Sequence, residues 1–231
     1  MNIVSYSLWG ENQKYTIGAI RNAEMNLEFY PGWISRFYVG TDVPKDIIDK
    51  LTKVENTEVI QMQGPNNGSA MMWRFLAADS NDTVIVRDAD CRPSWREVSA
   101  VDEWLSSDKN FHIMRDHPWH NTVIMGGMWG SRNGILRGIG EKIDQWPKTN
   151  ASALDQSFLR QEVFPLVQND CMIHDEFMAW GNGRPFPKPR ITTEFVGMPY
   201  DSYGYEHTDV ESVQYYRELI QEWIDKGSPL L

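Results

Sequence analysis

Two carboxylates directly follow a run of β-branched apolar residues. In TVIVRDADCRP, residues 83–93, Asp88 and Asp90 come after the apolar run with one residue between them. Side chains two apart on an extended backbone point to the same side, so both carboxylates would reach one cation. Such oxygen donors suit Mg²⁺ or Mn²⁺, which keep coordination positions for phosphate oxygens. The alternative is an ordinary turn after a strand, in which either carboxylate caps local N–H groups.

The pattern around this motif alternates between strands and helices. Short apolar runs predict strands over residues 2–8, 35–40, 57–62, 83–88, 111–116, 123–132 and 171–177. Helical spacing or helix-capping signals predict helices over 15–30, 44–54, 71–79, 94–107, 155–167 and 212–227. In the first helix the apolar positions are Ile17, Ile20, Met25 and Phe29. Strand–helix alternation predicts an α/β fold with a mixed, mostly parallel central sheet flanked by helices.

Composition sets the class of protein. The 231 residues are 41% hydrophobic and carry a formal net charge of −10. They suit one domain over 1–231. From the strand–helix pattern, we expect the regular half over 1–110 to be the nucleotide-binding half and the irregular half over 111–231, with its C-terminal helix, to be the acceptor half. Only Cys91 and Cys171 are present, so neither a disulfide framework nor a zinc site is expected. Strand-like sequence from Asn2 predicts no signal peptide, and no stretch has membrane-spanning length, so we expect a cytoplasmic protein without a membrane anchor.

Four motifs in order resemble a known family. MMWRFLAADSNDTVIVRDADCRP, residues 71–93, resembles the central segment of the GT-A nucleotide-sugar glycosyltransferases, most closely the retaining group with glycogenin and the lipopolysaccharide galactosyltransferases. There an aromatic–Arg–Leu/Phe helix precedes a strand ending in Asp-x-Asp. IMGGMWGSR, residues 124–132, resembles the family's glycine-containing strand, with Gly126 where Asn is usual. LDQSFL, 154–159, resembles its Asp-Gln helix start, and IHDEF, 173–177, supplies a late His.

The resemblance implies a GT-A, Rossmann-like fold and a metal ion. Asp88 and Asp90 would bind Mn²⁺ or Mg²⁺, with Asp88 also near the ribose, and His174 would be the third ligand. The family continues after its His with Gly and Lys-Pro-Trp, whereas HDEFMAW stands here. Asp175 and Glu176 are therefore alternatives to His174.

The resemblance also assigns the reacting groups. Asp155 and Gln156 would be catalytic, with the Gln amide facing the anomeric carbon of an oxocarbenium-like transition state in a reaction that retains configuration. An inverting enzyme would instead use Asp155 or Glu176 as its base. A further alternative for Asp155 is a helix N-cap. Arg74 would contact donor sugar or phosphate, or else pair with a nearby surface carboxylate, Asp79 or Asp82.

Two loops are candidates for substrate contacts. The loop after the first strand would hold the nucleotide: Tyr6 and Tyr15 by stacking, Asn12 through its amide. In RDHPWHN, residues 115–121, Asp116 and Trp119 are candidate sugar contacts.

These assignments predict a metal-dependent glycosyltransferase. It would move a sugar from a UDP-linked donor to a hydroxyl acceptor such as a glycan. One alternative is a nucleotidyltransferase, although SLWGENQKY, residues 7–15, is not the glycine-rich basic loop that such enzymes carry after the first strand. Another is a nucleotide-sugar-binding module without turnover. The acidic net charge disfavours nucleic acid as a partner. Hydroxymethylated DNA, whose bases carry a hydroxyl group, stays an alternative acceptor.

Overall fold

The computed structural model describes residues 1–149, 153–177, 182–200 and 210–226, and side-chain positions within the last range from residue 217. Its strands are β1 (Asn2–Leu8), β2 (Ile34–Val39), β3 (Thr57–Gln61), β4 (Thr83–Val86), β5 (Phe111–Arg115), β6 (Trp129–Ser131) and β7 (Cys171–Asp175). Its helices are α1 (Gln13–Phe29), α2 (Lys45–Leu51), η1 (Gly68–Ala78), α3 (Trp95–Leu105), α4 (Ile139–Gln145), α5 (Leu154–Phe158), η2 (Leu159–Val163), α6 (Phe164–Val167) and α7 (Val210–Asp225). Among the described helices, none is both long and apolar enough to cross a membrane.

The described strands form one sheet in the order β3-β2-β1-β4-β6-β5-β7. β1 pairs in parallel with β2 and with β4, and β5 pairs in parallel with β7, whereas β6 runs antiparallel to both of its neighbours. The predicted mixed, mostly parallel sheet is confirmed. The chain moves outward from β1 to β3 and then returns to the other side of β1 as β4. In open α/β sheets, ligands bind outside the carboxyl ends of the strands at such a switch point.

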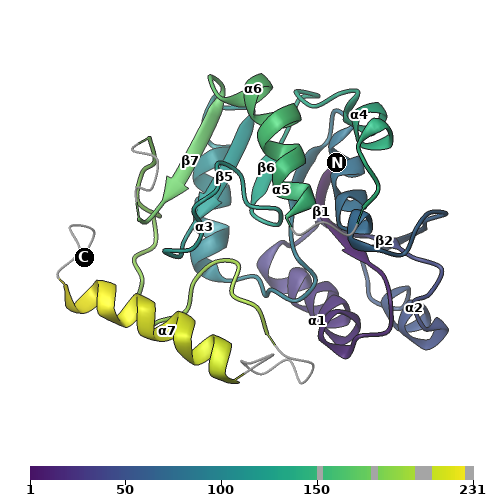
Figure 1. Ribbon diagram of the computed structural model, residues 1–231, viewed down its shortest axis with the longest axis horizontal. Coiled ribbons are helices and arrows are strands. Elements are labelled where there is room, and N and C mark those ends of the chain that lie inside the picture. The colour runs from purple at the N-terminus through teal and green to yellow at the C-terminus, as the bar shows by residue number, and fades with distance from the viewer. Residues whose placement is uncertain (150–152, 178–181, 201–209, 227–231) are drawn as a thin grey trace.

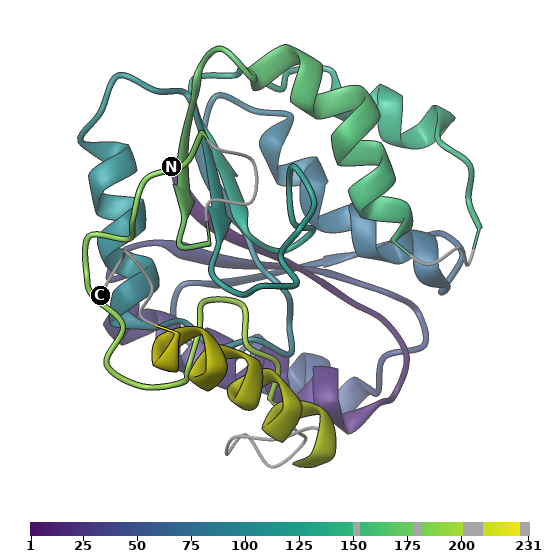
Figure 2. The ribbon, with the colours of Figure 1, turned by 60° about the vertical axis from the view of Figure 1, so that its left-hand side comes forward.

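Helices cover both faces of the sheet (Figures 1 and 2). On one face, α1, α2 and α3 pack through side chains such as Ala23, Leu51 and Trp104. On the other face, η1, α4 and the segment from α5 to α6 form a second apolar layer. The helix α7 packs Ile220 against Phe195. The fold is therefore a three-layer α/β/α arrangement, with the sheet in the middle.

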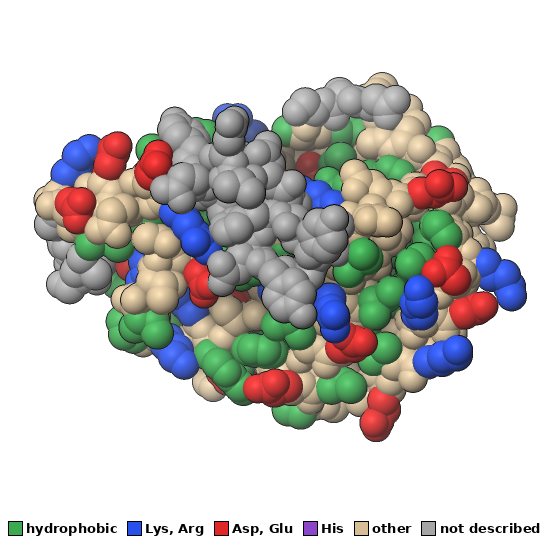
Figure 3. All heavy atoms as spheres, turned by 90° about the horizontal axis from the view of Figure 1, so that it is seen from below, with side chains coloured by type: hydrophobic (Ala, Val, Ile, Leu, Met, Phe, Trp, Pro, Cys, Tyr) green, Lys and Arg blue, Asp and Glu red, His purple; other side chains and the backbone are tan. Residues whose placement is uncertain are grey.

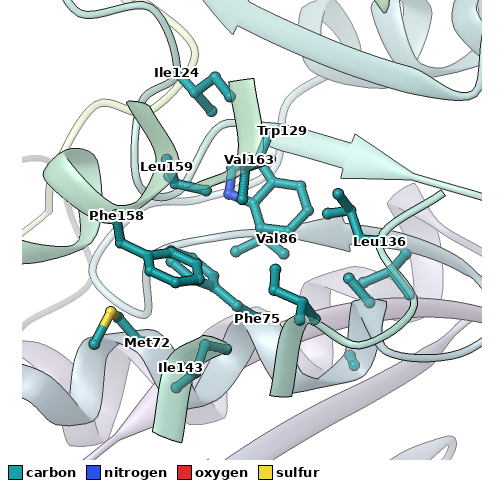
Figure 4. Close-up of a cluster of buried hydrophobic side chains, with 14 of the residues drawn as sticks. Met72, Phe75, Val86, Ile124, Trp129, Leu136, Ile143, Phe158, Leu159 and Val163 are labelled. Carbon is teal, nitrogen blue, oxygen red and sulfur yellow. The ribbon is translucent and has the colours of Figure 1, made fainter. Parts of the chain in front are cut away.

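Aromatic rings fill the layer on the η1 face (Figure 4). The ring centroid of Phe75 lies 5.3 Å from that of Trp129 and 6.2 Å from that of Phe158. Phe158 also meets Trp146 edge-on at 5.3 Å. These rings join η1, β6, α5 and the end of α4. Because this layer carries η1 and α5, its packing fixes the positions of Arg74 on η1 and Asp155 on α5.

The first helix buries a different face from the predicted one. Ile17, Ile20, Met25 and Phe29 are only partly buried, whereas the buried face consists of small and polar residues: Thr16, Gly18, Ala19, Asn22, Ala23 and Asn26. The small residues let the helix approach the sheet and its loops closely. The two asparagine side chains find buried hydrogen-bond partners there, which offsets the cost of burying them. The apolar pattern therefore predicted that a helix forms here but not which face of it is buried.

Two further elements differ in extent from the sequence prediction. The predicted strand over 123–132 contains only β6, because the backbone turns before it, with Met128 N–H donating to the carbonyl of Met125 at 3.3 Å. The predicted helix over 155–167 is one helical path in which the π-type turn η2 precedes Pro165. A wider turn suits that position, since proline offers no N–H to a regular helix.

Acidic and basic side chains are interspersed over the face of the molecule drawn in Figure 3. A surface that tracks a nucleic-acid backbone would instead gather Lys and Arg along one stripe.

We predict that the substitution Phe158→Ala lowers the free energy of unfolding by about 3–5 kcal/mol, because it opens a cavity among packed rings. Leu166→Ala, a few residues along the same helical path, is the control, since Leu166 is 55% exposed. Its effect should stay within about 0.5 kcal/mol. Urea denaturation followed by circular dichroism measures both. Equal effects for the two variants would contradict this account of the core.

Candidate active site

Three chain segments converge at one edge of the sheet. β1 and β4 are parallel neighbours, so the loops that follow them leave the sheet side by side. β6 is antiparallel to β4, and Trp129 lies opposite Val86, so the segment before β6 arrives at the same edge. The helix α5 adds a fourth segment through a buried ion pair. Together they enclose a cavity of about 560 Å³.

Helix α1 holds the turn that carries the two aspartates. Asn22 Nδ2 donates a hydrogen bond to the carbonyl of Ala89 at 3.0 Å. Gly18 faces the same carbonyl, and a Cβ built there would lie only 2.3 Å from its oxygen. A residue larger than glycine would push the turn away. The buried polar face of α1 thus positions the backbone between Asp88 and Asp90.

The two aspartates line the cavity from a turn rather than from extended backbone. β4 ends at Val86, and Cys91 N–H donates to the carbonyl of Asp88 at 3.2 Å. The expectation that both side chains project from an extended backbone was therefore wrong, although both carboxylates do line the same cavity. Their charged partners are Arg74 for Asp88 and Lys14 for Asp90, at 2.5 and 2.6 Å.

One buried guanidinium connects the aspartate turn to α5. Arg74 is 5% exposed; its Nη1 donates to Asp88 Oδ1 at 2.5 Å and its Nη2 to Asp155 Oδ2 at 2.9 Å. Its backbone is bonded to β1, since Arg74 N–H donates to Ser7 Oγ at 2.8 Å and Ser5 Oγ donates to its carbonyl at 2.7 Å. The alternative pairing of Arg74 with a nearby surface carboxylate is not what the structure contains.

Two glycines make room for this ion network. A Cβ at Gly126 would lie 2.1 Å from Asp155 Oδ2 and 2.9 Å from Arg74 Nη2. A Cβ at Gly127 would lie 2.1 Å from Asp88 Oδ2. Neither position has space for another residue while the carboxylates keep their places. This gives a physical reason for glycine at 126, where the family that the sequence resembles usually has asparagine.

The site carries more negative than positive charge. Glu11, Asp88, Asp90 and Asp155 line the cavity together with Arg74, and Lys14 contacts Asp90 from its side, a formal excess of two negative charges. Burial raises the pKa of Asp90, and the negative charge of Asp88 raises it further. Burial also raises the pKa of Asp155, against the lowering effect of Arg74. A cation at this site would favour the charged form of both carboxylates.

The aspartate pair fits a divalent metal ion with two protein ligands. Asp88 Oδ2 and Asp90 Oδ1 have no basic partner among the described residues, and both side chains line the cavity. Mg²⁺ is commonly held by one or two carboxylates together with substrate phosphates and water. Among the described residues, no group of three or more His, Cys, Asp and Glu is placed to hold a metal ion. The site would therefore need oxygens from a substrate to complete the coordination.

The β1–α1 loop forms the aromatic end of the cavity. The ring of Tyr15 lies nearly parallel to that of Trp9, with centroids 6.4 Å apart and 14° between the planes. Asn12 caps α1, its Oδ1 accepting from Lys14 N–H at 3.0 Å. Asn12 and Tyr15, which were predicted to contact the nucleotide, both line the cavity, and so does Trp9. A planar base could lie against this end.

The start of α5 brings Asp155 and Gln156 to the opposite end. Asp155 is not the helix N-cap; that residue is Ala153, in the left-handed region with φ 55°. Asp155 Oδ1 accepts from Gln156 N–H at 2.8 Å, so both of its oxygens are engaged. Within the described residues the Gln156 side chain makes no hydrogen bond, and it lines the cavity. Gln156 is thus the side chain with an unused amide at this end.

Tyr6 does not belong to the site. Its ring is buried and stacks on Phe37 with centroids 4.7 Å apart, and its hydroxyl accepts from Asn26 Nδ2 at 3.0 Å. Burial raises the pKa of its hydroxyl. Tyr6 points into the α1 face of the core, because alternate side chains of β1 point to opposite faces. The prediction that it stacks on a nucleotide was wrong.

Asp116 is a structural carboxylate rather than a sugar contact. It is fully buried, and Arg96 donates to both of its oxygens at 3.0 and 2.9 Å. Arg190 Nη2 and Val196 N–H donate to it as well, at 2.5 and 2.8 Å. No oxygen of Asp116 remains for a ligand, so the prediction that it contacts a sugar was wrong. Glu176, the alternative base, is likewise buried and accepts from Arg96 at 2.6 Å.

His174 is occupied elsewhere in the sheet. It is buried on β7, its Nδ1 lies 2.8 Å from His112 Nε2, and its Nε2 lies 3.4 Å from Glu103 Oε2. It does not line the cavity with Asp88 and Asp90. It lies on β7, three strands from β4 in the sheet, and is therefore not counted with Asp88 and Asp90 as a candidate metal ligand.

Sequence reasoning missed Lys14 and Trp9. Lys14 neutralises Asp90, and Trp9 forms the aromatic end of the cavity with Tyr15. Both follow β1 closely, and their position at the carboxyl end of a parallel strand was the signal that could have found them.

Comparisons with known proteins give the fold and little more. No protein-family model and no curated protein matches the chain. A putative glucose-1-phosphate thymidylyltransferase from Bacillus anthracis superposes with a TM-score of 0.50 at 10% identity, over 75% of this chain and 86% of that one. Glucosyl-3-phosphoglycerate synthase from Mycobacterium tuberculosis, crystallised with Mn²⁺, UDP-glucose and phosphoglyceric acid, gives 0.49 at 14% identity over 74% and 68%.

The likeness to the thymidylyltransferase agrees with a mixed, mostly parallel α/β fold of the Rossmann-like kind. At such identities the likeness concerns the fold. Neither protein is a glycogenin or a lipopolysaccharide galactosyltransferase, so the resemblance of the sequence to that group stays a prediction.

We predict that Gly126→Ala breaks the Arg74–Asp155 ion pair, because the added methyl group occupies the place of the Asp155 carboxylate. Loss of a buried ion pair with its partners left behind costs about 3–5 kcal/mol, and we expect a fall in unfolding free energy approaching that range. Gly64→Ala is the control, since a Cβ there meets Trp73 at an ordinary 3.4 Å. Chemical denaturation measures both. A Gly126→Ala protein as stable as the control would show that the network is not tightly packed.

Proposed function

We propose that this protein is a metal-dependent glycosyltransferase that moves a sugar from a UDP-linked donor to a hydroxyl acceptor such as a glycan. The observation that carries the proposal is the convergence of the Asp88 and Asp90 carboxylates, the Arg74 guanidinium and the Gln156 amide on one cavity at the carboxyl ends of β1 and β4. The aromatic end of that cavity would take the uracil base, and the aspartates would hold Mn²⁺ or Mg²⁺ against the diphosphate.

The charge of the cavity supports a metal-bound diphosphate. A diphosphate entering a site with two excess negative charges would be repelled. A divalent cation, when bound, would offset this repulsion and the charge that develops on the leaving diphosphate. The chain's own contribution is positional: Arg74 fixes the Asp88 carboxylate, and Lys14 fixes that of Asp90. Neither aspartate would need to reorient on binding, which favours electrostatic catalysis.

The reaction breaks the bond between the anomeric carbon and the diphosphate oxygen, and forms a bond from that carbon to the acceptor oxygen. The acceptor proton passes to the departing diphosphate. The unused amide of Gln156 supports its assignment to the face of the oxocarbenium-like centre, where its oxygen would stabilise positive charge.

The partners of the two alternative bases support retention over inversion. Asp155 has both oxygens engaged, by Arg74 and by the N–H of Gln156. Glu176 is buried against Arg96 and does not line the cavity. A general base must lie within hydrogen-bond reach of the acceptor hydroxyl with a free oxygen.

We predict that UDP with Mn²⁺ stabilises the protein against heat, whereas UDP with EDTA does not. At a ligand concentration of 100 times Kd the gain is about 2.7 kcal/mol. Asp90→Asn should abolish the Mn²⁺-dependent part of the shift, because a neutral amide is a poorer ligand. Asp108→Asn, an exposed aspartate on another loop, is the matched control. An equal shift in the presence of EDTA would remove the metal from the proposal.

We also predict that Gln156→Ala lowers kcat for UDP release from a UDP-sugar by about 10²-fold or more, since it removes a group that acts in the transition state. The KM for the donor should change far less, because Gln156 is assigned to the reacting carbon and not to the nucleotide. Steady-state kinetics with UDP detection measures the split. A rise in donor KM with kcat preserved would place Gln156 in the nucleotide site.

The same assay separates the other candidate classes. A nucleotidyltransferase would release pyrophosphate from a nucleoside triphosphate and a sugar phosphate, and would release no UDP from a UDP-sugar. A binding module would give the thermal shift without turnover of any donor.

A further inference from the structure

A second cavity, of about 310 Å³, lies directly beside the first. The two share Asp88, Asp90 and Met125, so the aspartate pair stands between them. The rest of the second wall comes from the loop after β5 and from the segment around Phe195. β5 runs in the same direction as β4, because both are antiparallel to β6, and its following loop therefore reaches the same edge of the sheet.

Aromatic rings dominate the outer wall of this second cavity. Trp119 is 46% exposed, and its ring meets that of His117 edge-on at 5.9 Å. Phe195 packs against His117 and His120, with ring centroids 4.5 and 5.6 Å apart. The wall is thus a surface of packed rings that includes one partly exposed indole.

Backbone hydrogen bonds fix the two imidazole rings in that wall. Trp119 N–H donates to His117 Nδ1 at 3.1 Å, and Asp116 N–H donates to His120 Nδ1 at 3.0 Å. Each ring is therefore held in one orientation. Burial lowers the pKa of His120 to about 3, so at neutral pH this imidazole carries no charge.

The charges around the second cavity disfavour an anionic occupant. Two aspartates line it, and neither Lys nor Arg is among its lining residues in the described part of the chain. A bound metal ion would offset the aspartates, but the donor diphosphate would add negative charge beside it. A phosphorylated or carboxylated acceptor would meet repulsion here without a paired cation.

We infer that the second cavity receives the acceptor, and that the acceptor is an uncharged sugar whose ring lies against Trp119. This inference rests on the proposed function. The C–H face of a pyranose is apolar and suits an aromatic ring, while its hydroxyls suit carboxylate and imidazole edges. The volume lies at the lower end of the range of about 300–1,000 Å³ for small-molecule sites, which suits one sugar ring at a time.

The experiment measures UDP release from UDP-glucose and UDP-galactose with Mn²⁺, first with water as the acceptor and then with added hydroxyl compounds. The neutral set is the methyl glycosides of glucose, galactose and mannose; the anionic compound is 3-phosphoglycerate. We expect at least one methyl glycoside to accelerate UDP release and to appear as a disaccharide product by mass spectrometry. Acceleration by 3-phosphoglycerate alone, or by none of these compounds while water still serves, would overturn the inference.

Substitutions at Trp119 test its position. An aromatic contact contributes about 0.5–1.5 kcal/mol, so Trp119→Ala should raise the acceptor KM by up to about tenfold. Trp119→Phe should restore most of the loss, because a flat ring remains. Trp95→Ala is the matched control: Trp95 is 47% exposed on α3 and lines neither cavity. An unchanged acceptor KM in Trp119→Ala, or an equal change in Trp95→Ala, would overturn the contact.

Failure of this inference differs from failure of the proposed function. If UDP with Mn²⁺ binds and UDP is released with water as acceptor, the donor site stands and only the acceptor class is at issue. If neither is observed with either donor, the glycosyltransferase proposal itself fails.

Discussion

The geometry of the site depends on one guanidinium that two carboxylates share. Arg74 is buried, and a buried cation is costly unless its charge is paired. Asp88 and Asp155 supply that pairing from two segments far apart in the sequence, and β1 bonds the Arg74 backbone from a third. Each partner can move only if the others follow. A site with this construction is preorganised, since its carboxylates are oriented by a counter-charge that belongs to the protein.

The antiparallel direction of β6 places backbone directly against the ion network of Arg74, Asp88 and Asp155. A parallel strand next to β4 would send its following loop to this edge, whereas β6 sends its preceding segment, which arrives as a tight turn. Gly126 and Gly127 then pass within contact of the Asp155 and Asp88 carboxylates. Because no side chain fits there, backbone covers the buried Arg74–Asp155 pair on that side, while Asp88 still faces the cavity. Shielding from water strengthens the attraction between its charges.

Much of the fold and part of the site could be predicted from the sequence, for different physical reasons. Strand and helix order, apart from α4, follows from local patterns, and the motif around Asp88 and Asp90 follows from a strand end. Tyr6 and His174 could not be placed, because a polar aromatic or imidazole side chain fits a core equally well when a buried partner exists. Those partners, Asn26 and His112, lie far away in the sequence. The pairing of the Asp116 carboxylate could not be predicted for the same reason, since its partners Arg190 and Val196 are also far away in the sequence.

Charge connects the two proposed substrates. The Asp88–Asp90 pair faces both cavities, so any charge placed on one side is felt on the other. On the proposed donor side, an anionic diphosphate would need a cation to offset its charge, and the two aspartates would hold that cation against the phosphates. On the proposed acceptor side, the bound donor would screen that cation, and the described residues of the cavity wall supply no further positive charge. A neutral acceptor avoids the repulsion that a second anion would meet. It also leaves the aromatic wall as the main source of binding free energy, since apolar contact is favourable whatever the charge state of the donor.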